Sequence, residues 1–152
     1  YRFSTILRDV LTRLSLDQSR RNISKLSSLL RKTFGEEVLA KVMADDVKEN
    51  KNNLIVVEGI RRWADIAYLQ QLPNFFLIGL DADSKIRYKR LKKRAENKGD
   101  DKKTFKRFLA EEKMEADAEI PEIIKKAVFH LNNDLDLANL YSQIDKLLTK
   151  WK

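Results

Sequence analysis

The sequence predicts an α/β fold, a three-layer arrangement in which a parallel sheet carries helices on both faces. Segments with apolar residues at helical spacing alternate along the 152 residues with three short apolar runs, at 54–58, 75–80 and 127–131. These runs are too short for helices and show no polar face, which is typical of strands buried on both sides. Helices between such strands indicate a parallel sheet, and the length suits one domain.

Three helices are predicted before the first strand. The first, at 5–14, has apolar side chains on one face and is preceded by Ser4, which we expect to be its N-cap. The second, at about 23–34, is stopped by Gly35, and the third follows at 36–49. We expect all three to pack their apolar faces into a common core.

The remaining elements continue the alternation. A helix at 62–72, the strand at 75–80, helices at 84–97 and 102–116, the strand at 127–131 and a closing helix at 135–150 follow the first strand. His130 lies inside the last apolar strand, which predicts a packed core side chain. The polar run at 96–103 has almost nothing to bury and predicts a mobile loop.

Composition excludes several kinds of protein. The chain has no Cys and a single His, which excludes disulfides and a thiolate nucleophile and argues against a structural metal site. Its apolar runs are far shorter than the roughly 20 residues of a membrane span. We therefore expect a cytoplasmic protein with no membrane partner.

The positive charge is concentrated in one stretch. The net charge is +8, yet residues 85–107 hold twelve Lys and Arg against three acids. The rest of the chain holds 19 basic and 20 acidic residues, so it is nearly neutral. One stretch therefore carries the whole positive excess.

Candidate ligand-binding residues follow the ends of the predicted strands, where ligands bind in open α/β sheets. They are Glu58, Arg61 and Arg62 after the first strand, Arg87, Arg90 and Arg94 after the second, Asn132 and Asn133 after the third, and Ser4, Thr5 and Arg8 near the start of the chain. Arginines grip phosphate oxygens and one acid can hold a hydrated Mg²⁺, so the set indicates a polyphosphate site. Taken singly, Arg8 and the arginine row are also what a solvated helix face shows.

Four segments carry a family resemblance. FSTILRDVL (3–11), VVEGIRR (56–62), LIGLDADSKIRYKRLKKR (77–94) and HLNND (130–134) occur in this order along nearly the whole chain. Together they resemble the nucleoside-monophosphate-kinase-type P-loop kinases, of the adenylate kinase and dephospho-CoA kinase kind. The resemblance implies an ATP-dependent phosphotransferase that uses Mg²⁺ and acts on a nucleotide or a similar small phosphorylated acceptor.

The resemblance also implies roles for the candidate residues. Ser4, Thr5 and Arg8, with Arg61 or Arg62, would bind the acceptor; Glu58 would hold Mg²⁺ through water; Arg90 and Arg94 would stabilise the transferred phosphoryl group; Asn132 or Asn133 would contact the donor base. Residues 85–116 would form a short basic helical lid. Glu58 stands where the family more often has Asp, and GIRR replaces the GFPR of adenylate kinases, which leaves the acceptor arginine open.

One family motif is absent from the 152 residues. A P-loop reads G-x-x-x-x-G-K-[ST], but the four glycines stand at 35, 59, 79 and 99, and no two are five apart. In the family this loop follows the central strand of the sheet. We therefore expect residues 1–152 to be a single kinase-like domain that lacks its central strand, with about 25–40 further residues upstream, the size of a strand–loop–helix unit. The chain as given is expected to be inactive.

Two other functions stay open. A nucleotide-binding regulatory domain without catalysis would keep the same fold, as in a deoxycytidylate-deaminase-type protein. A nucleic-acid-binding module would use the basic stretch, with Tyr88, Phe105 and Phe108 as stacking side chains. We rank the nucleic-acid module below the other two because these residues form no recognised nucleic-acid motif.

Overall fold

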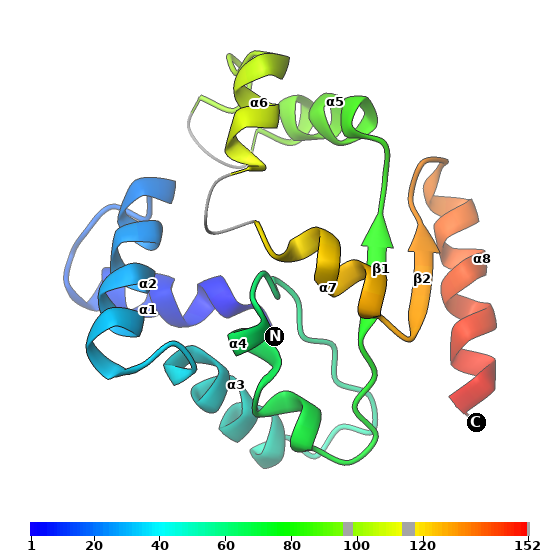
Figure 1. Ribbon diagram of the computed structural model, residues 1–152, viewed down its shortest axis with the longest axis horizontal. Coiled ribbons are helices and arrows are strands. Elements are labelled where there is room, and N and C mark those ends of the chain that lie inside the picture. The colour runs from blue at the N-terminus through cyan, green and yellow to red at the C-terminus, as the bar shows by residue number, and fades with distance from the viewer. Residues whose placement is uncertain (96–98, 114–117, 152) are drawn as a thin grey trace. The chain divides into compact units, whose positions relative to one another are not determined.

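The α/β class is confirmed by the computed structural model, which describes residues 1–95, 99–113 and 118–151 (Figure 1). The chain divides into two compact units, Tyr1–Phe75 and Phe76–Lys152, here called the first and second units. Helices dominate both, and the second unit holds a parallel sheet of two strands. Each unit is described by itself.

The first unit consists of helices packed around one apolar core. Its elements are α1 (Phe3–Arg13), α2 (Arg20–Phe34), α3 (Val38–Glu49), α4 (Trp63–Ile66) and a 3₁₀ turn at Leu69–Gln71. Ser19 caps α2 by accepting a hydrogen bond from the backbone N–H of Asn22, and Gly35 ends it with a φ of 100°. The core contains Phe3, Leu7, Leu39, Met43, Ala44 and Leu69. The periodicity of the first three helices predicted these faces only in part, because three residues expected to face inward, Leu14, Leu29 and Val42, are exposed.

Helix α1 begins before the predicted cap. The expectation that Ser4 is the N-cap is wrong, because Arg2 is the N-cap and Ser4 lies in the first turn. The backbone N–H of Phe3 donates to the carbonyl of Glu58 (3.2 Å), which satisfies a donor that a free helix start leaves unpaired. A contact distant in sequence therefore sets this helix boundary.

Residues 54–58 do not form the buried strand that their apolar sequence predicts. They make a single parallel bridge, between Arg2 and Glu58, in which the Glu58 N–H donates to the carbonyl of Tyr1 (2.9 Å). The side chains of Leu54 and Val56 are 56% and 67% exposed, whereas Val57 packs against the core. Only one face of this segment packs within the first unit, so the prediction of burial on both faces is wrong.

The second unit is built on the strands β1 (Ile78–Asp81) and β2 (Phe129–Asn132). They pair in parallel, with Ile78 opposite Phe129 and Asp81 opposite Asn132. The helices are α5 (Ser84–Arg94), α6 (Phe105–Glu111), α7 (Ile120–Lys126) and α8 (Leu137–Leu148), followed by a 3₁₀ turn at Thr149–Trp151. Helix α7 has only seven residues and was not predicted. The helix predicted at 102–116 is observed as the shorter α6, which ends at Glu111. Positions 114–116 lie outside the described residues.

Helix α7 packs closely against one face of β1 (Figure 1). A Cβ atom on Gly79 would lie 3.1 Å from Cγ2 of Ile124 and 3.3 Å from Cβ of Ala127, so a larger residue there would push these neighbours away by a few tenths of an ångström. On the strand's other face, Ile78 and Leu80 are 38% and 50% exposed, and His130 of β2 is exposed as well. The expectations of strands buried on both faces and of a core His130 are therefore wrong, because only one face of β1 packs closely in this unit.

Gly79→Val is expected to lower the free energy of unfolding by about 1–3 kcal/mol, because the added side chain overlaps Ile124 and Ala127 in a packed contact. Urea denaturation followed by circular dichroism measures the change. The control is Leu80→Val on the exposed face, expected to change stability by less than about 0.5 kcal/mol. Equal midpoints for the Gly79 variant and the wild type would contradict this packing account.

The predicted lid contains its own small core. The rings of Tyr88, Phe105 and Phe108 lie with their centroids 5.2–6.2 Å apart, and the Tyr88 hydroxyl donates to the carbonyl of Lys103 (2.7 Å). Phe108 is buried. These aromatic side chains pack on one another. They therefore serve as a small core, and not as an open surface on which bases could stack.

Buried charges hold residues 99–103 in place, which are part of the run at 96–103 predicted to be a mobile loop. The ammonium of Lys103 lies 3.1 Å from Asp100 and 2.8 Å from Glu111, and the side chains of Lys103 and Asp100 are almost fully buried. The expectation that residues 99–103 have almost nothing to bury is therefore wrong; positions 96–98 lie outside the described residues. Because Glu111 also pairs with Arg107, acids that follow the basic stretch neutralise part of its charge.

Candidate functional site

The first unit brings the start of α1 next to the end of residues 54–58. The Arg2–Glu58 bridge joins them, and the Cβ position of Gly59 lies 3.7 Å from Phe3. Ser4 and Thr5, predicted to bind the acceptor, therefore begin close to Glu58, predicted to hold Mg²⁺. Gly59 takes a φ of 88°, which turns the chain sharply after Glu58.

The carboxylate of Glu58 is 56% exposed and forms an ion pair with Arg2. Proteins usually hold Mg²⁺ through one or two carboxylates, several waters and substrate phosphates, so one exposed carboxylate fits that role. Within residues 1–95, 99–113 and 118–151, no three His, Cys, Asp or Glu side chains gather in a way that would hold a metal ion without such help. Glu58 is thus suited to a metal that arrives with a phosphate ligand.

The two candidate arginines after Glu58 differ in their surroundings. Arg62 is largely buried and lies 3.2 Å from the carboxylate of Glu36, whereas Arg61 is exposed. The backbone N–H groups of both donate to Oδ2 of Asp65, at 2.9 and 3.0 Å. Arg8 lies on α1 and donates to the side-chain oxygen of Gln18 (3.2 Å). Arg61 is therefore the better placed of the pair to meet a ligand from solvent.

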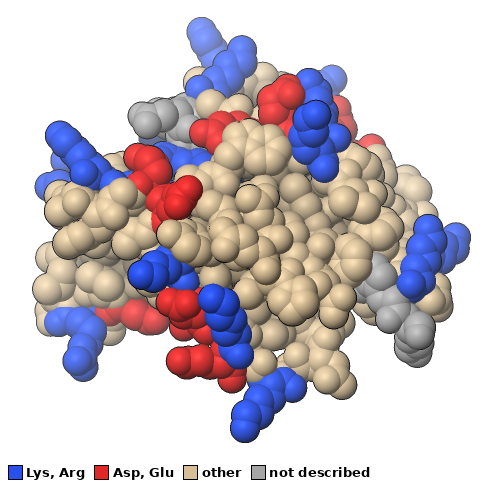
Figure 2. Space-filling model, turned by 60° about the horizontal axis from the view of Figure 1, so that its bottom comes forward, with Lys and Arg blue, Asp and Glu red and all other residues tan. Residues whose placement is uncertain are grey.

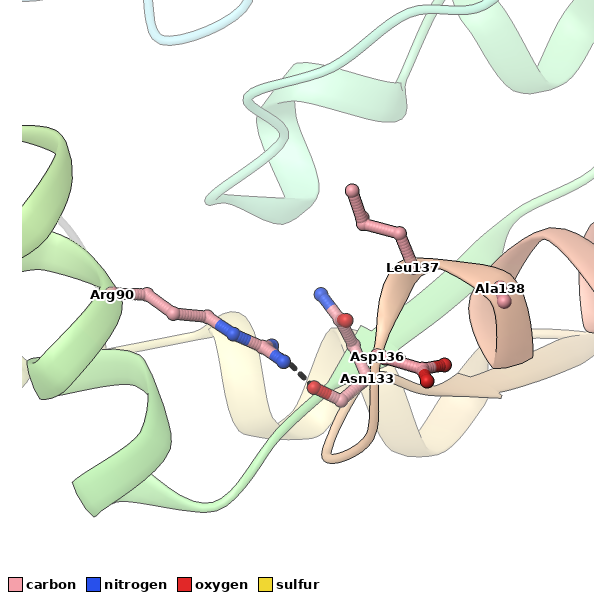
Figure 3. Close-up of a pocket in the computed structure, with 5 residues that line it drawn as sticks. All are labelled: Arg90, Asn133, Asp136, Leu137 and Ala138. Carbon is pink, nitrogen blue, oxygen red and sulfur yellow. Dashed lines mark hydrogen bonds between the residues drawn. The ribbon is translucent and has the colours of Figure 1, made fainter.

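An open hollow of about 590 Å³ lies beyond the carboxyl ends of β1 and β2, in the second unit (Figure 3). It is lined by Arg90, Asn133, Asp136, Leu137 and Ala138. In Figure 3 the side-chain amide of Asn133 lies between Arg90 and Leu137. This hollow combines a guanidinium, a primary amide and two apolar side chains at the sheet edge where α/β proteins bind ligands.

Arg90 is anchored to the loop that follows β2. Its guanidinium donates to the carbonyl oxygens of Asn133 and Leu135, the second bond measuring 2.6 Å. Arg94, one helical turn further along α5, is exposed and does not line the hollow. Arg87, on the same helix, forms an ion pair with Glu112 and lies over the ring of Phe108. Of the three arginines predicted on one face, Arg90 alone reaches the described hollow.

The two candidate asparagines have different roles in the structure. The side chain of Asn132 forms a tight turn with Asp134, through two hydrogen bonds of 2.9 Å. The backbone N–H and carbonyl of Asn132 both bond to the side-chain amide of Gln143 on α8, at 3.0 and 2.8 Å, which covers the strand edge there. Asn133, and not Asn132, therefore faces the hollow.

Asp134 joins this loop to the start of α5. Hydrogen bonds from the Asn132 side chain and from the backbone N–H of Asp83, with the nearby Arg90 charge, hold the pKa of Asp134 below its ordinary value. A lowered pKa means that the carboxylate stabilises the loop at neutral pH. That contribution is lost as pH falls through the lowered pKa, on the acid side of roughly pH 4.

An NMR titration of the Asp134 carboxyl group is expected to give a midpoint below that of an unstructured aspartate. Asn132→Ala is expected to move the midpoint upward, because it removes the largest of the interactions that favour the charged form. A wild-type midpoint at or above the unstructured value would contradict this geometry.

Several structural residues near the candidate sites were not found from the sequence. The clearest are the buried partners Arg31 and Asp65, which are 34 positions apart, and the buried pair Asp100 and Lys103 in the second unit. The sequence did hold one signal for Arg31, because this residue lies beside the apolar stripe of α2 that includes Ile23 and Leu30. A cation at such a position needs a buried acceptor.

Fold and side chains together define an α/β protein with two candidate anion-binding regions, one in each unit. No known protein-family model matches the chain. It is similar over 150 residues to a UPF0200 protein of Hyperthermus butylicus, with 23% identity over 99% of this chain and 80% of the relative. UPF0200 proteins of Methanoregula boonei and Methanocaldococcus jannaschii are 26% and 27% identical, over 94% and 88% of this chain and 78% and 68% of theirs. These names state no activity.

None of the helices in the described part of the chain is long and apolar enough to cross a membrane.

Proposed function

We propose that this chain is part of an ATP-dependent phosphotransferase that acts on a nucleotide or a similar small phosphorylated acceptor. The observation that supports it most is the hollow beyond β1 and β2, where Arg90 and Asn133 stand beside Leu137 and Ala138. A planar base fits between apolar side chains and an amide, and a guanidinium suits the phosphates attached to it.

The proposal assigns roles by the same chemistry. Asn133 would contact the donor base, and Arg90 with Arg94 would neutralise charge on the transferred phosphoryl group. Ser4, Thr5, Arg8 and Arg61 or Arg62 would bind the acceptor, while Glu58 would hold Mg²⁺ through water. The metal, when bound, would neutralise phosphate charge; the protein's part is positioning for in-line transfer. A three-layer P-loop-kinase sheet and a relation to adenylate or dephospho-CoA kinases belong to this proposal.

The assay uses the full natural polypeptide, because the 152 residues contain no P-loop motif. Coupled ADP formation is measured with Mg²⁺–ATP and a panel of nucleoside monophosphates and dephospho-CoA. The proposal predicts turnover with at least one acceptor, and a fall of about 10²-fold or more in kcat/KM for Arg90→Ala. Absence of turnover with every acceptor would count against catalysis.

A nucleotide-binding regulatory domain is the second candidate. It is favoured by one observation: the Arg90 guanidinium donates to two loop carbonyls, those of Asn133 and Leu135, which suits a structural clamp. Saturable ATP binding by the full natural polypeptide, without turnover of any acceptor, would support this candidate instead.

The nucleic-acid module is not favoured. The aromatic side chains that would stack on bases form the core of the lid, and on the face shown in Figure 2 basic side chains are interrupted by acidic and uncharged ones. Non-specific nucleic-acid binding depends on a run of cations that follows the phosphate backbone.

A further inference from the structure

We propose that the buried ion pair Arg31–Asp65 positions the Arg61–Arg62 turn to bind the phosphate of the acceptor. Arg31 and Asp65 would act as positioning residues, since both are buried. The inference rests on the proposed function, because it assumes that this turn meets a phosphorylated ligand.

The two charges are almost completely withdrawn from water. Arg31 is 6% exposed and Asp65 is 2% exposed, and the guanidinium of Arg31 donates to Oδ1 of Asp65. Removing two charges from water costs desolvation energy that offsets most of their mutual attraction. Apolar residues of similar size therefore often stabilise a fold equally well. A contribution to stability is therefore a weak explanation for the presence of this pair. Its hydrogen bonds suggest a second role, in positioning the Arg61–Arg62 turn.

Asp65 uses its two oxygens for different tasks. Oδ1 receives Arg31, while Oδ2 receives the consecutive backbone N–H groups of Arg61 and Arg62, at 2.9 and 3.0 Å. Both arginine side chains thus start from a backbone that one carboxylate fixes. Restricting the backbone in advance reduces the entropy lost when the side chains close on a ligand.

Arg31 fixes the other side of the same turn. Its guanidinium also donates to the backbone carbonyl of Glu36, whose carboxylate lies 3.2 Å from Arg62. The end of α2, the turn before α3 and the turn before α4 are therefore joined through one buried guanidinium. Arg62 pairs with Glu36 and is only partly exposed, whereas Arg61 is the exposed member of the pair.

The test compares two double variants that differ only in the acceptor at position 65. Both lose the buried charges: Arg31→Met/Asp65→Asn keeps a side-chain oxygen for the two N–H groups, and Arg31→Met/Asp65→Leu removes it at nearly the same volume. The probe is inorganic phosphate, titrated calorimetrically into the full natural polypeptide. We expect the Asn variant to bind within about threefold of the wild type and the Leu variant to bind about tenfold or more weakly.

Equal phosphate affinities for the two double variants would overturn the positioning role. If they do not fold, Arg31→Lys replaces them, because Lys keeps the charge but lacks the planar fork with which the guanidinium bonds Asp65 and Glu36 together. Its affinity is expected to fall by about threefold or more, and an unchanged affinity would overturn the proposal. In the kinase assay, the Leu variant is expected to raise KM for the acceptor but not for ATP, which general destabilisation would not do selectively.

Arg61→Ala separates this inference from the proposed function. Loss of phosphate binding in Arg61→Ala, together with equal binding by the two double variants, would remove the positioning role alone. A wild-type protein that binds no phosphate, or an Arg61→Ala variant that binds it normally, would remove the acceptor site and the positioning role with it.

Discussion

Arg31→Met is expected to lower the free energy of unfolding by about 3–5 kcal/mol, the usual cost of removing one partner from a buried ion pair. The substitution leaves the carboxylate of Asp65 buried without its cation and removes a second hydrogen bond, to the carbonyl of Glu36. Urea denaturation followed by circular dichroism is the measurement.

Lys48→Met is the matched control for Arg31→Met. Lys48 also pairs with an aspartate in the first unit, at 3.8 Å from Asp45, but both side chains are more than half exposed. An exposed pair of this kind contributes about 0–1 kcal/mol. If both variants lost similar amounts of unfolding free energy, the prediction that burial makes the loss of Arg31 more costly would be wrong.

Lys103→Met is expected to destabilise the second unit by about 3–5 kcal/mol for the same physical reason. Lys103 stands between the carboxylates of Asp100 and Glu111, so its removal leaves a buried negative charge close to a second one. Hydrogen exchange measured by mass spectrometry is expected to show faster exchange in peptides from α5 and α6.

Lys125→Met on α7 is the control for Lys103→Met. Its partner Glu122 lies only 2.6 Å away, yet both side chains are largely exposed. Exchange in α5 and α6 is expected to remain at the wild-type rate in this variant. If Lys103→Met also left that rate unchanged, the buried cluster of Asp100, Lys103 and Glu111 would not be what holds α5 and α6 in place.

The sequence predicted elements whose signal is local. Helical periodicity located α1, α2 and α3, and Gly35 marked the end of α2 as predicted. Helix α7, a seven-residue helix with Pro121 in its first turn, was missed. The strands near 78–81 and 129–132 were located, but their burial was not, because an apolar run does not reveal which of its faces has a neighbour.

The candidate sites were predictable only in part. That Arg90 and Asn133 lie beside one hollow was predictable, because polar residues after parallel strands meet at one sheet edge. Leu137 and Ala138 were not, since apolar residues at a helix start carry no signal of ligand binding. The Arg31–Asp65 pair depends on two segments 34 residues apart, and no local pattern links them.

The most direct test of the central proposal is the binding of Mg²⁺–ATP to the hollow beyond β1 and β2. Calorimetric titration of the full natural polypeptide is compared with Arg90→Ala and Leu137→Asp, and with Leu29→Asp, a control on α2 of similar exposure. The proposal predicts saturable binding that both site variants weaken by about tenfold or more, while the control binds normally. Absence of saturable binding, or equal affinity in all four proteins, would contradict it.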